Sequence, residues 1–378
     1  MRFSQRIQRI EVSGTYKVVA AAALLKQQGV HLLDLGAGEP HFRTPDHISE
    51  AAVRAIREGH THYTSGPGII ELREAIAQRH AEDFETNYSA ENAIVTSGGK
   101  FALFAALEVL LDHGDEVIIP KPYWVSFKDI TQFAGARPVF IEPAADFAVS
   151  AEQIAAAITP RTRAIILNSP SNPSGAVLSP ETVRRIVHLA VQHEILVIAD
   201  ECYAYLVYDA QRVSAAKFDQ ENVIVIGSLS KTYAMTGWRV GYALAPKPVI
   251  SMMQRLQSQT LTSVAEPVQW AAVAALTGPQ RCISEMLKEY RSNRDLMWSA
   301  LHEIPGVQCT LPQGAFYLLP RIEGHSSEDL AASLLHDAHL VCVPGDAFGL
   351  PGHLRFSYAV APQVAADASA RLAQFLLR

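Results

Sequence analysis

Lys231 follows a run of residues that is typical of a buried strand. The run Val223–Ile226 is apolar and β-branched, and a turn of small polar residues, Gly227–Ser230, separates it from the lysine. A lysine that is half-buried at the end of such a strand loses proton affinity, and its neutral amine is then a nucleophile toward a carbonyl group. By itself the pattern fits an ordinary surface lysine after a strand equally well.

A carboxylate, Asp200, follows another apolar run, Ile195–Ala199. A buried carboxylate is unfavourable unless a cation pairs with it, so we expect Asp200 to face a positive charge. Glu201 is the alternative carboxylate, but side chains alternate along a strand, so Glu201 is expected to point away. Tyr203 adds a phenol two residues beyond Glu201.

Two glycines, Gly98 and Gly99, follow the run Ala93–Thr96 and precede Lys100 at the start of a helix. Glycines at a helix N-terminus expose backbone N–H groups to an anion such as a phosphate, and the helix dipole favours negative charge there. A plain strand-to-helix turn would have the same pattern, so both interpretations stay open.

Three further residues suit the binding of a planar, carboxylated ligand. Trp124 follows the run Asp115–Ile119 and could stack on a ring, although it also fits a core aromatic. Asn172 lies in a proline-rich turn after the run Arg163–Leu167. Arg355 stands inside an apolar strand and needs an anion, which is either a ligand carboxylate or a partner in an internal salt bridge.

The elements that position these residues alternate between apolar strands and helices up to about residue 280. This alternation predicts βαβ units and an α/β fold with a mostly parallel, doubly wound sheet, and beyond it we expect a smaller α+β domain. The predicted strands are Leu32–Leu35, Ala93–Thr96, Asp115–Ile119, Pro138–Ile141, Arg163–Leu167, Ile195–Ala199, Val223–Ile226, Ala315–Leu319, His339–Val343 and Leu354–Tyr358. The predicted helices include Ile69–Ala81, Gly99–Leu111, Ala151–Ile158, Pro180–His193, Arg281–His302 and Asp329–Ala338.

Bulk composition limits the classes of function. The 378 residues favour two domains, and 49% hydrophobic with 19% charged residues is typical of a folded soluble protein. A net charge of −6 and the lack of a basic cluster argue against a nucleic-acid surface. No apolar run reaches the length of a membrane span, and the run Val18–Leu25 is too short and too interrupted to indicate export.

Cysteine and histidine spacing argues against a metal site. The four cysteines contain no C-x-x-C pair, and the fourteen histidines show no H-x-x-x-H or H-E-x-x-H spacing. Free thiols in a reducing compartment are the expected state, which favours the cytoplasm.

The segment around the lysine resembles the cofactor-lysine motif of fold type I pyridoxal-phosphate enzymes. Ser228, Lys231, Gly237 and Arg239 match S-x-x-K-x-x-x-x-x-G-x-R in place. The chain is most similar to class I aminotransferases of the I-gamma subgroup, which holds bacterial aspartate and prephenate aminotransferases. The similarity extends over nearly the whole chain.

The resemblance implies pyridoxal 5′-phosphate as cofactor and gives each strand-end residue a role toward it. Lys231 would form the Schiff base, Asp200 would face the pyridinium nitrogen and Tyr203 would donate to the ring O3′, and these three residues form the implied catalytic set. The implied cofactor-binding set is Gly98, Gly99, Lys100, Trp124, Asn172, Asp200, Tyr203, Ser228, Ser230, Lys231, Arg239 and, from the neighbouring subunit, Tyr63.

The resemblance also implies how a substrate is held. Arg355 would bind the α-carboxylate, with Asn172, Trp124 and the backbone of Gly38 beside it. Lys100, in G-G-K, would bind the distal carboxylate of a dicarboxylic substrate, unless it only neutralises phosphate or lies in solvent. Thr15, in a segment similar to the family's S-A-T, would help with the distal carboxylate.

Two departures from the family pattern leave the amino-acid preference open. Glu11 stands where many relatives have a basic residue, and a negative charge there would weaken the binding of an acidic substrate unless it pairs with a cation or points away. Phe101 replaces a frequent glutamine.

The resemblance further implies an obligate homodimer with shared active sites, since Tyr63 and the segment Gln259–Pro267 match interface segments. It divides the chain into an N-terminal segment, residues 1–45, that packs with a small domain, a large cofactor-binding domain, residues 46–280, and the small domain itself, residues 281–378.

These features predict a ping-pong aminotransferase that moves an amino group from an L-amino acid to a 2-oxo acid. The donor is expected to be acidic, with an aromatic donor as the other option. Two alternatives are a carbon–sulfur lyase or aminocyclopropane-carboxylate synthase on the same fold, and a non-enzymatic sensor. The sensor is disfavoured because the segment ahead of residue 46 is too short for a DNA-binding domain.

Overall fold

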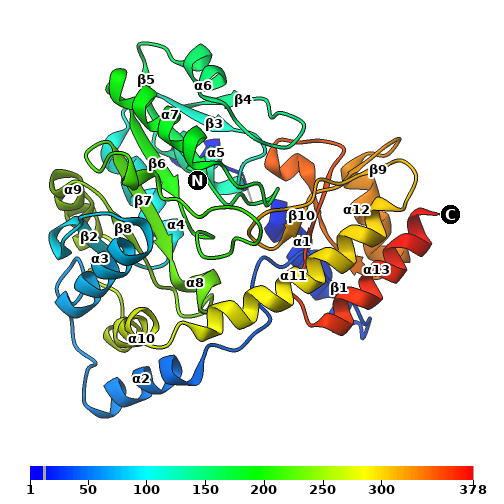
Figure 1. Ribbon diagram of the computed structural model, residues 1–378, viewed down its shortest axis with the longest axis horizontal. Coiled ribbons are helices and arrows are strands. Elements are labelled where there is room, and N and C mark those ends of the chain that lie inside the picture. The colour runs from blue at the N-terminus through cyan, green and yellow to red at the C-terminus, as the bar shows by residue number, and fades with distance from the viewer. Residues whose placement is uncertain (12–13, 378) are drawn as a thin grey trace.

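The computed structural model describes residues 1–11 and 14–377, without the side chains of residues 14–17 and 19 (Figure 1). The side chain of Thr15, whose contact with the substrate was predicted, is therefore not described.

A seven-stranded sheet forms the centre of the larger part of the molecule, in the order β2-β8-β7-β6-β5-β3-β4. Its strands are β2 (Ala93–Thr96), β3 (Glu116–Pro120), β4 (Arg137–Ile141), β5 (Thr162–Asn168), β6 (Leu196–Asp200), β7 (Val223–Ser228) and β8 (Gly241–Leu244). Neighbours from β4 to β7 pair in parallel, whereas β8 is antiparallel to both β2 and β7. The predicted mostly parallel sheet is confirmed, and β8 is a strand that the sequence did not predict.

Helices cover both faces of this sheet because its strands are apolar on both faces (Figure 1). They are α3 (Ile70–Phe84), α4 (Gly99–Leu110), α5 (Val125–Phe133), α6 (Ala151–Ala157), α7 (Pro180–Gln192), α8 (Leu229–Thr232), α9 (Lys247–Ser258) and α10 (Glu266–Thr277), and α2 (Asp46–Arg57) packs on α10. Ile165 and Val197 pack toward α3, α7 and α10, whereas their neighbours Ile166 and Ile198 pack toward α4, α5 and α9. The sheet therefore separates two hydrophobic cores.

The C-terminal part is a smaller α+β assembly with its own core. It contains α11 (Arg281–His302), β9 (Val307–Gln308), β10 (Tyr317–Leu318), β11 (Arg321–Ile322), α12 (Ser327–Asp337), β12 (Leu340–Val341), β13 (Val343–Pro344), β14 (Leu354–Ser357) and α13 (Pro362–Leu376). The helices α11 and α13 lie side by side (Figure 1). β14 pairs with both β10 and β13.

The predicted strand His339–Val343 is in fact two strands in different sheets. β12 pairs in parallel with β1 (Leu33–Asp34), whereas β13 pairs with β14, so the chain changes partner at the buried Cys342. The predicted strand Ala315–Leu319 is shorter than expected, since only Tyr317 and Leu318 pair with β14.

The N-terminal helix, α1 (Gly14–Gln27), packs against the C-terminal part. Ala22 and Leu32 share a small hydrophobic cluster with Leu335 and Val341. Within the described residues no helix is long and apolar enough to cross a membrane.

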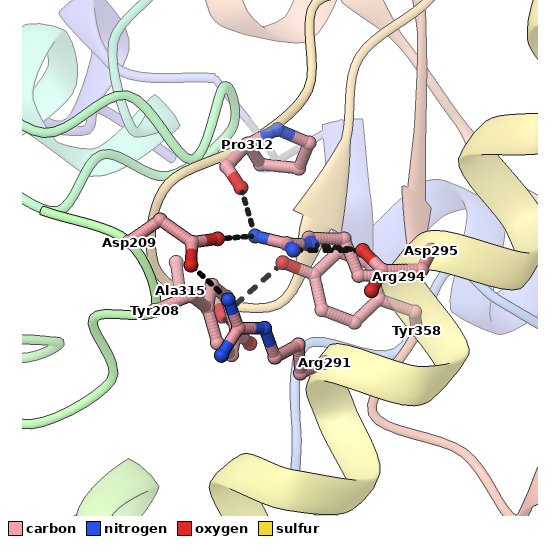
Figure 2. Close-up of polar contacts among 8 residues, drawn as sticks. All are labelled: Tyr208, Asp209, Arg291, Arg294, Asp295, Pro312, Ala315 and Tyr358. Carbon is pink, nitrogen blue, oxygen red and sulfur yellow. Dashed lines mark hydrogen bonds and ion pairs between the residues drawn. The ribbon is translucent and has the colours of Figure 1, made fainter.

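A polar network around Arg294 ties the loop after Tyr203 to the C-terminal part (Figure 2). The Arg294 side chain is 3% exposed, and its Nη1 donates to Asp209 Oδ2 and to the carbonyl oxygen of Pro312, both at 3.0 Å. The Tyr208 hydroxyl donates to the carbonyl oxygen of Ala315 at 2.5 Å. These bonds hold residues 312–315, which lead into β10, against the larger part of the molecule.

Candidate active site

The carboxyl ends of β5, β6 and β7 meet at one edge of the central sheet, where ligands bind in open α/β folds. Strand pairing places Asn168 opposite Asp200, and Asp200 opposite Ile226. Ser228 ends β7 two residues later, and the short helix α8 then carries Lys231. The sheet thus brings together residues that the sequence separates by more than sixty positions.

Lys231 is a half-buried amine without a carboxylate partner in the described part of the chain. Its Nζ donates to the carbonyl oxygen of Gly38 at 2.5 Å. Burial lowers the pKa of Lys231, the charges of Arg355 and Arg239 lower it further, and Cys202 and Glu39 oppose them. A lowered pKa increases the fraction of neutral amine, which is the nucleophilic and proton-accepting form.

Asp200 is a carboxylate that is only 7% exposed and has no cation paired with it among the described residues. Its Oδ1 accepts one hydrogen bond, from the backbone N–H of Cys202 at 3.1 Å. Burial raises the pKa of Asp200 to about 7, with the N–H of Cys202 opposing and the charge of Glu201 adding to the rise. A protonated ring nitrogen is a cation that would offset the free-energy cost of burying this carboxylate in its charged form.

Glu201 points to a different environment, as strand alternation predicts. Its Oε1 accepts hydrogen bonds from the hydroxyl of Ser214 at 2.7 Å and the N–H of Ala215 at 3.0 Å. Its Oε2 lies 3.6 Å from Nε2 of the buried His80. Glu201 therefore acts on Asp200 only as a nearby charge.

Arg239 and the start of α4 form an anion cradle beside the sheet edge. The Arg239 guanidinium packs so closely on Gly98, where φ is +80°, that a Cβ added there would lie 2.5 Å from Nη2. A Cβ on Gly241 would lie 2.4 Å from the backbone nitrogen of Gly99. Side chains at these positions would close the cradle, so the glycines keep the backbone N–H groups accessible to an anion.

The positive charge in this cradle is not neutralised by any carboxylate within the described residues. Arg239 donates from Nη1 only to the carbonyl oxygen of Thr236, at 2.9 Å. Partial burial lowers the pKa of Lys100, and the charge of Arg239 lowers it further. The hydroxyl of Ser228 accepts from the N–H of Ser230 at 3.2 Å and begins α8. The guanidinium of Arg239, the ammonium group of Lys100 and the hydroxyl of Ser228 can each donate a hydrogen bond to an anion, so the cradle fits a phosphate group.

Trp124 lies beside Lys100, whose Nζ is 4.9 Å from the centroid of the indole ring. The ring is half-buried and packs edge-to-face on Phe127, with centroids 5.5 Å apart. Trp124 thus lies beside the cradle, at the edge of the core between the sheet and α4, α5 and α9, where a planar ring could stack on it.

Arg355 is a second buried charge without a counter-ion in the described ranges, since it is 2% exposed and forms no salt bridge there. Its Nη1 donates to Asn172 Oδ1 at 2.9 Å and its Nη2 to the carbonyl oxygen of Gly36 at 2.8 Å. Its buried Nε has no hydrogen-bond partner among the residues that the structure describes. An unsatisfied guanidinium of this kind fits a bound carboxylate.

Tyr317 is a site residue that the sequence did not single out. Its hydroxyl lies 2.7 Å from that of Tyr203. The guanidinium carbon of Arg355 lies 4.5 Å from the centroid of the Tyr317 ring. A Cβ added to Gly38 would lie 2.7 Å from the Tyr317 hydroxyl and would have to displace it. The contacts of Tyr317 are distant in sequence, and its only local signal is its place in an apolar strand.

Tyr63 does not join these residues within its own chain. Its side chain is 89% exposed, and it lines a groove of about 530 Å³ with Ser263–Pro267. Of the two departures from the family pattern, Phe101 directly follows Lys100 in the first turn of α4 and so lies next to the cradle. Glu11 raises the pKa of Tyr123 and of Asp129, in each case less than burial does, and Phe101 packs 5.8 Å from Phe104.

Comparisons with known proteins agree with this geometry. The family model for aminotransferase class I and II matches residues 30–372. An aspartate/prephenate aminotransferase of Thermus thermophilus is 41% identical over 99% of both chains, and an aspartate aminotransferase of Geobacillus stearothermophilus is 38% identical over 100% of this chain and 99% of its own.

Solved structures of similar proteins have the same fold. The aspartate aminotransferase of Thermus thermophilus with maleate superimposes with a TM-score of 0.97 at 40% identity, covering 100% of both chains. An alanine aminotransferase of Pyrococcus furiosus gives a TM-score of 0.95 at 33% identity, also covering 100% of both chains. Proteins named for acidic and for neutral substrates thus share this backbone.

The raised pKa of Asp200 predicts a pH dependence of stability in the cofactor-free protein. The pKa of Asp200 is about 7 in the folded protein, whereas that of an aspartate in an unfolded chain is about 3.9, so the folded state binds the proton more tightly. The contribution of Asp200 to the free energy of unfolding therefore falls as pH rises from about 4 to 7, and it is constant above that. Asp200→Asn removes this dependence.

Urea unfolding of the two cofactor-free proteins at pH 5 and pH 8 measures the effect. The stability of Asp200→Asn relative to wild type should increase by about 3 kcal/mol between these pH values. An equal stability difference at both pH values would show that Asp200 has an ordinary pKa.

Proposed function

The chain belongs to the aminotransferase class I and II family, and from this membership we propose that its amino donor is an acidic L-amino acid of the aspartate or glutamate type. The acceptor is a 2-oxo acid. The enzyme depends on pyridoxal phosphate. The observation that carries the choice of donor is Lys100, a cation beside Trp124 that no carboxylate of the described chain neutralises.

The residues at the sheet edge divide into those that hold the cofactor and those that move a proton. Pyridoxal phosphate, when bound, supplies an aldehyde that receives the amino group and a ring that withdraws electron density from the reacting carbon. Arg239, Ser228 and the N–H groups at Gly98 and Gly99 would hold its phosphate. Trp124 would stack on its ring, and Asp200 would keep the ring nitrogen protonated.

Lys231 is proposed as the attachment point of the cofactor and as the general base. Its lowered pKa favours the neutral amine, which can take the α-proton of the substrate and later return it. The contact of Nζ with the carbonyl oxygen of Gly38 gives this amine a defined direction. The same residues would serve both halves of a ping-pong reaction.

Arg355 and Asn172 are proposed to orient the substrate by its α-carboxylate. The Arg355 side chain is already fixed by Asn172 Oδ1 and the carbonyl oxygen of Gly36, and its charge is unpaired among the described residues. A carboxylate would complete its hydrogen bonding with a charge-assisted pair. Holding the α-carbon in place in this way supplies the orientation that proton transfer needs.

Lys100 is proposed to bind the distal carboxylate of the donor. The pKa of Lys100 is lowered by burial and by Arg239, so an added anion would stabilise its charged form. Glu11 is not among the groups that shift the pKa of Lys100, and its charge acts on Asp129 and Tyr123 instead. Thr15, whose side chain is not described, remains a second proposed contact.

Other reactions on this fold are less favoured. A carbon–sulfur lyase or aminocyclopropane-carboxylate synthase would use the same cofactor residues, but relatives that match over the full length are named aspartate aminotransferases. The likeness to an alanine aminotransferase keeps a neutral donor as the second candidate.

A homodimer with shared active sites is also proposed. Tyr63 and the segment Ser263–Pro267 form an exposed groove, and the chain also exposes large apolar side chains, among them Ile56, Ile70 and Leu261. Tyr63 would reach the partner's cofactor phosphate. Sedimentation equilibrium should give twice the chain mass of 41.2 kDa, and a fully active monomer would contradict the shared site.

The division into residues 1–45, 46–280 and 281–378 remains a proposal, as does a cytoplasmic location. Pairing of β1 with β12 supports packing of the N-terminal segment with the small domain. All four cysteines are free thiols, which supports a reducing compartment.

Lys231→Ala tests the proposed attachment point. The variant should lose the visible absorbance of the bound cofactor and more than about 1,000-fold of kcat, because it lacks both the attachment amine and the general base. Lys217→Ala, which removes a surface lysine paired with Glu85, is the control and should keep both properties. Substantial turnover by Lys231→Ala would end the proposal.

Lys100→Ala tests the donor. If Lys100 binds the distal carboxylate, kcat/KM for aspartate should fall about 10- to 100-fold, since one charge-assisted hydrogen bond contributes about 1.5–3 kcal/mol. The value for phenylalanine should change less than about 3-fold, and Lys100→Arg should restore part of the aspartate activity. Equal losses with both donors would instead assign Lys100 to the cofactor phosphate.

A further inference from the structure

We propose that Tyr317 is a positioning residue that directs the Tyr203 hydroxyl toward the cofactor oxygen and holds the Arg355 guanidinium that binds the substrate carboxylate. This inference rests on the proposed function, in which Tyr203 donates to the ring oxygen of the cofactor. It assigns a role to a residue of the C-terminal part that acts on the reaction through Tyr203 and Arg355.

Tyr317 begins β10 and lies between the two groups that it would position. It pairs with Ser357 of β14, two residues after Arg355, and its side chain is fully buried. Its hydroxyl lies 2.7 Å from the Tyr203 hydroxyl, and its ring face lies 4.5 Å below the Arg355 guanidinium carbon. One side chain therefore contacts both a proposed cofactor contact and a proposed substrate contact.

Counting donors and acceptors indicates which of the two hydroxyls, that of Tyr203 or that of Tyr317, donates to the other. Each phenol hydroxyl has one proton to donate and lone pairs with which to accept. Among the described residues, the hydroxyls of Tyr203 and Tyr317 bond only to each other, and either could be the donor. If Tyr203 donated to Tyr317, it would have no proton left for the cofactor oxygen, so Tyr317 must be the donor.

Each hydroxyl of the pair carries a proton that it can donate. Burial raises the pKa of both phenols, so both keep their protons at neutral pH. The Tyr317 hydroxyl lies against Gly38, where an added Cβ would be 2.7 Å away, and its hydrogen-bond partner among the described residues is the Tyr203 hydroxyl. A chain from Tyr317 to Tyr203 to the cofactor oxygen polarises each hydroxyl in turn.

The Tyr317 ring has a separate effect on Arg355. A guanidinium over an aromatic face is attracted to it, and the Phe348 ring, 5.0 Å away, adds a second face. This contact limits the directions of the guanidinium and leaves its Nη atoms on Asn172 Oδ1 and the carbonyl oxygen of Gly36. Removing the ring should therefore affect substrate binding, whereas removing only the hydroxyl should not.

The chain that leads into Tyr317 is held both by Tyr208 of the larger part and by Arg294 of α11 (Figure 2). The Tyr208 hydroxyl donates to the carbonyl oxygen of Ala315 at 2.5 Å, and Arg294 Nη1 donates to that of Pro312 at 3.0 Å. Tyr208 is five residues beyond Tyr203, so the segments that carry the two phenols are bonded to each other. These bonds hold the hydroxyls of Tyr203 and Tyr317 in fixed positions relative to each other.

The experiment compares Tyr317→Phe with a matched control, Tyr290→Phe, in the cofactor-bound enzyme. Tyr290 belongs to the same hydrophobic cluster, and its buried hydroxyl has no partner in the described structure. Both variants lose one buried phenol oxygen, but only Tyr317→Phe releases Tyr203. The readouts are the pH midpoint of the cofactor absorbance, kcat and KM for aspartate, and the thermal midpoint.

In Tyr317→Phe we expect the absorbance midpoint to move up by about 0.5 to 1 pH unit, a change of about 3- to 10-fold in proton affinity. The reason is that a misdirected Tyr203 donates less well, so negative charge on the cofactor oxygen is less stabilised and the bound cofactor holds its proton more tightly. The value of kcat should fall several-fold and KM should change less than about 2-fold. Tyr290→Phe should leave the midpoint, kcat and KM at wild-type values.

Two further variants separate the two effects of Tyr317. Tyr317→Leu should show the same midpoint shift and, because the ring is lost, a rise of about 10-fold in KM. Tyr203→Phe should shift the midpoint at least as far as Tyr317→Phe, and the double variant should shift it no further, since Tyr317 acts through Tyr203.

Three results would overturn the inference while leaving the proposed function intact. They are an unchanged midpoint in Tyr317→Phe, a lowered thermal midpoint as its only change, or midpoint shifts that add in the double variant. If Tyr317→Phe does not fold, an unchanged midpoint in Tyr203→Phe decides against the inference, because Tyr317 is proposed to act on the midpoint through Tyr203. A wild-type enzyme without cofactor absorbance or turnover would instead contradict the proposed function itself.

Discussion

Buried charge without a partner is the constraint on which this site depends. Asp200 and Arg355 are 7% and 2% exposed, and neither forms a salt bridge within the described residues. Lys231 is similarly unpaired, and its pKa is lowered by burial. Such groups destabilise a folded protein unless a ligand supplies the missing charge. We therefore expect cofactor and substrate to stabilise the fold on which they act.

Several residues of the site follow from local sequence. A lysine and an aspartate after buried strands, and glycines at the start of a helix, were predicted from strand ends and helix dipoles, and the structure brings them to one sheet edge. The parallel sheet itself was predicted because its strands are apolar throughout, which is typical of burial on both faces. The roles of Asn172 and Arg355 came from family resemblance, since their contact joins positions 183 residues apart.

Other features left no local signal in the sequence. Strand β8 is only four residues long, and its antiparallel place between β2 and β7 depends on segments distant in sequence. The break at Cys342 is set by the competition of β1 and β14 for neighbouring residues. Tyr317 is recognisable only through the Tyr203 hydroxyl, 114 residues away. In each case the decisive contact is tertiary, and periodicity does not report it.

The antiparallel insertion of β8 has a consequence for the order of folding. Gly241 pairs with both Thr96 and Ser228, so the phosphate cradle exists only after chain segments about 145 residues apart have met. Contacts of such sequence separation form slowly, because loop closure precedes any gain from them. A chain emerging from the ribosome would therefore capture its cofactor only after residue 241 has been synthesised, as a late event of maturation.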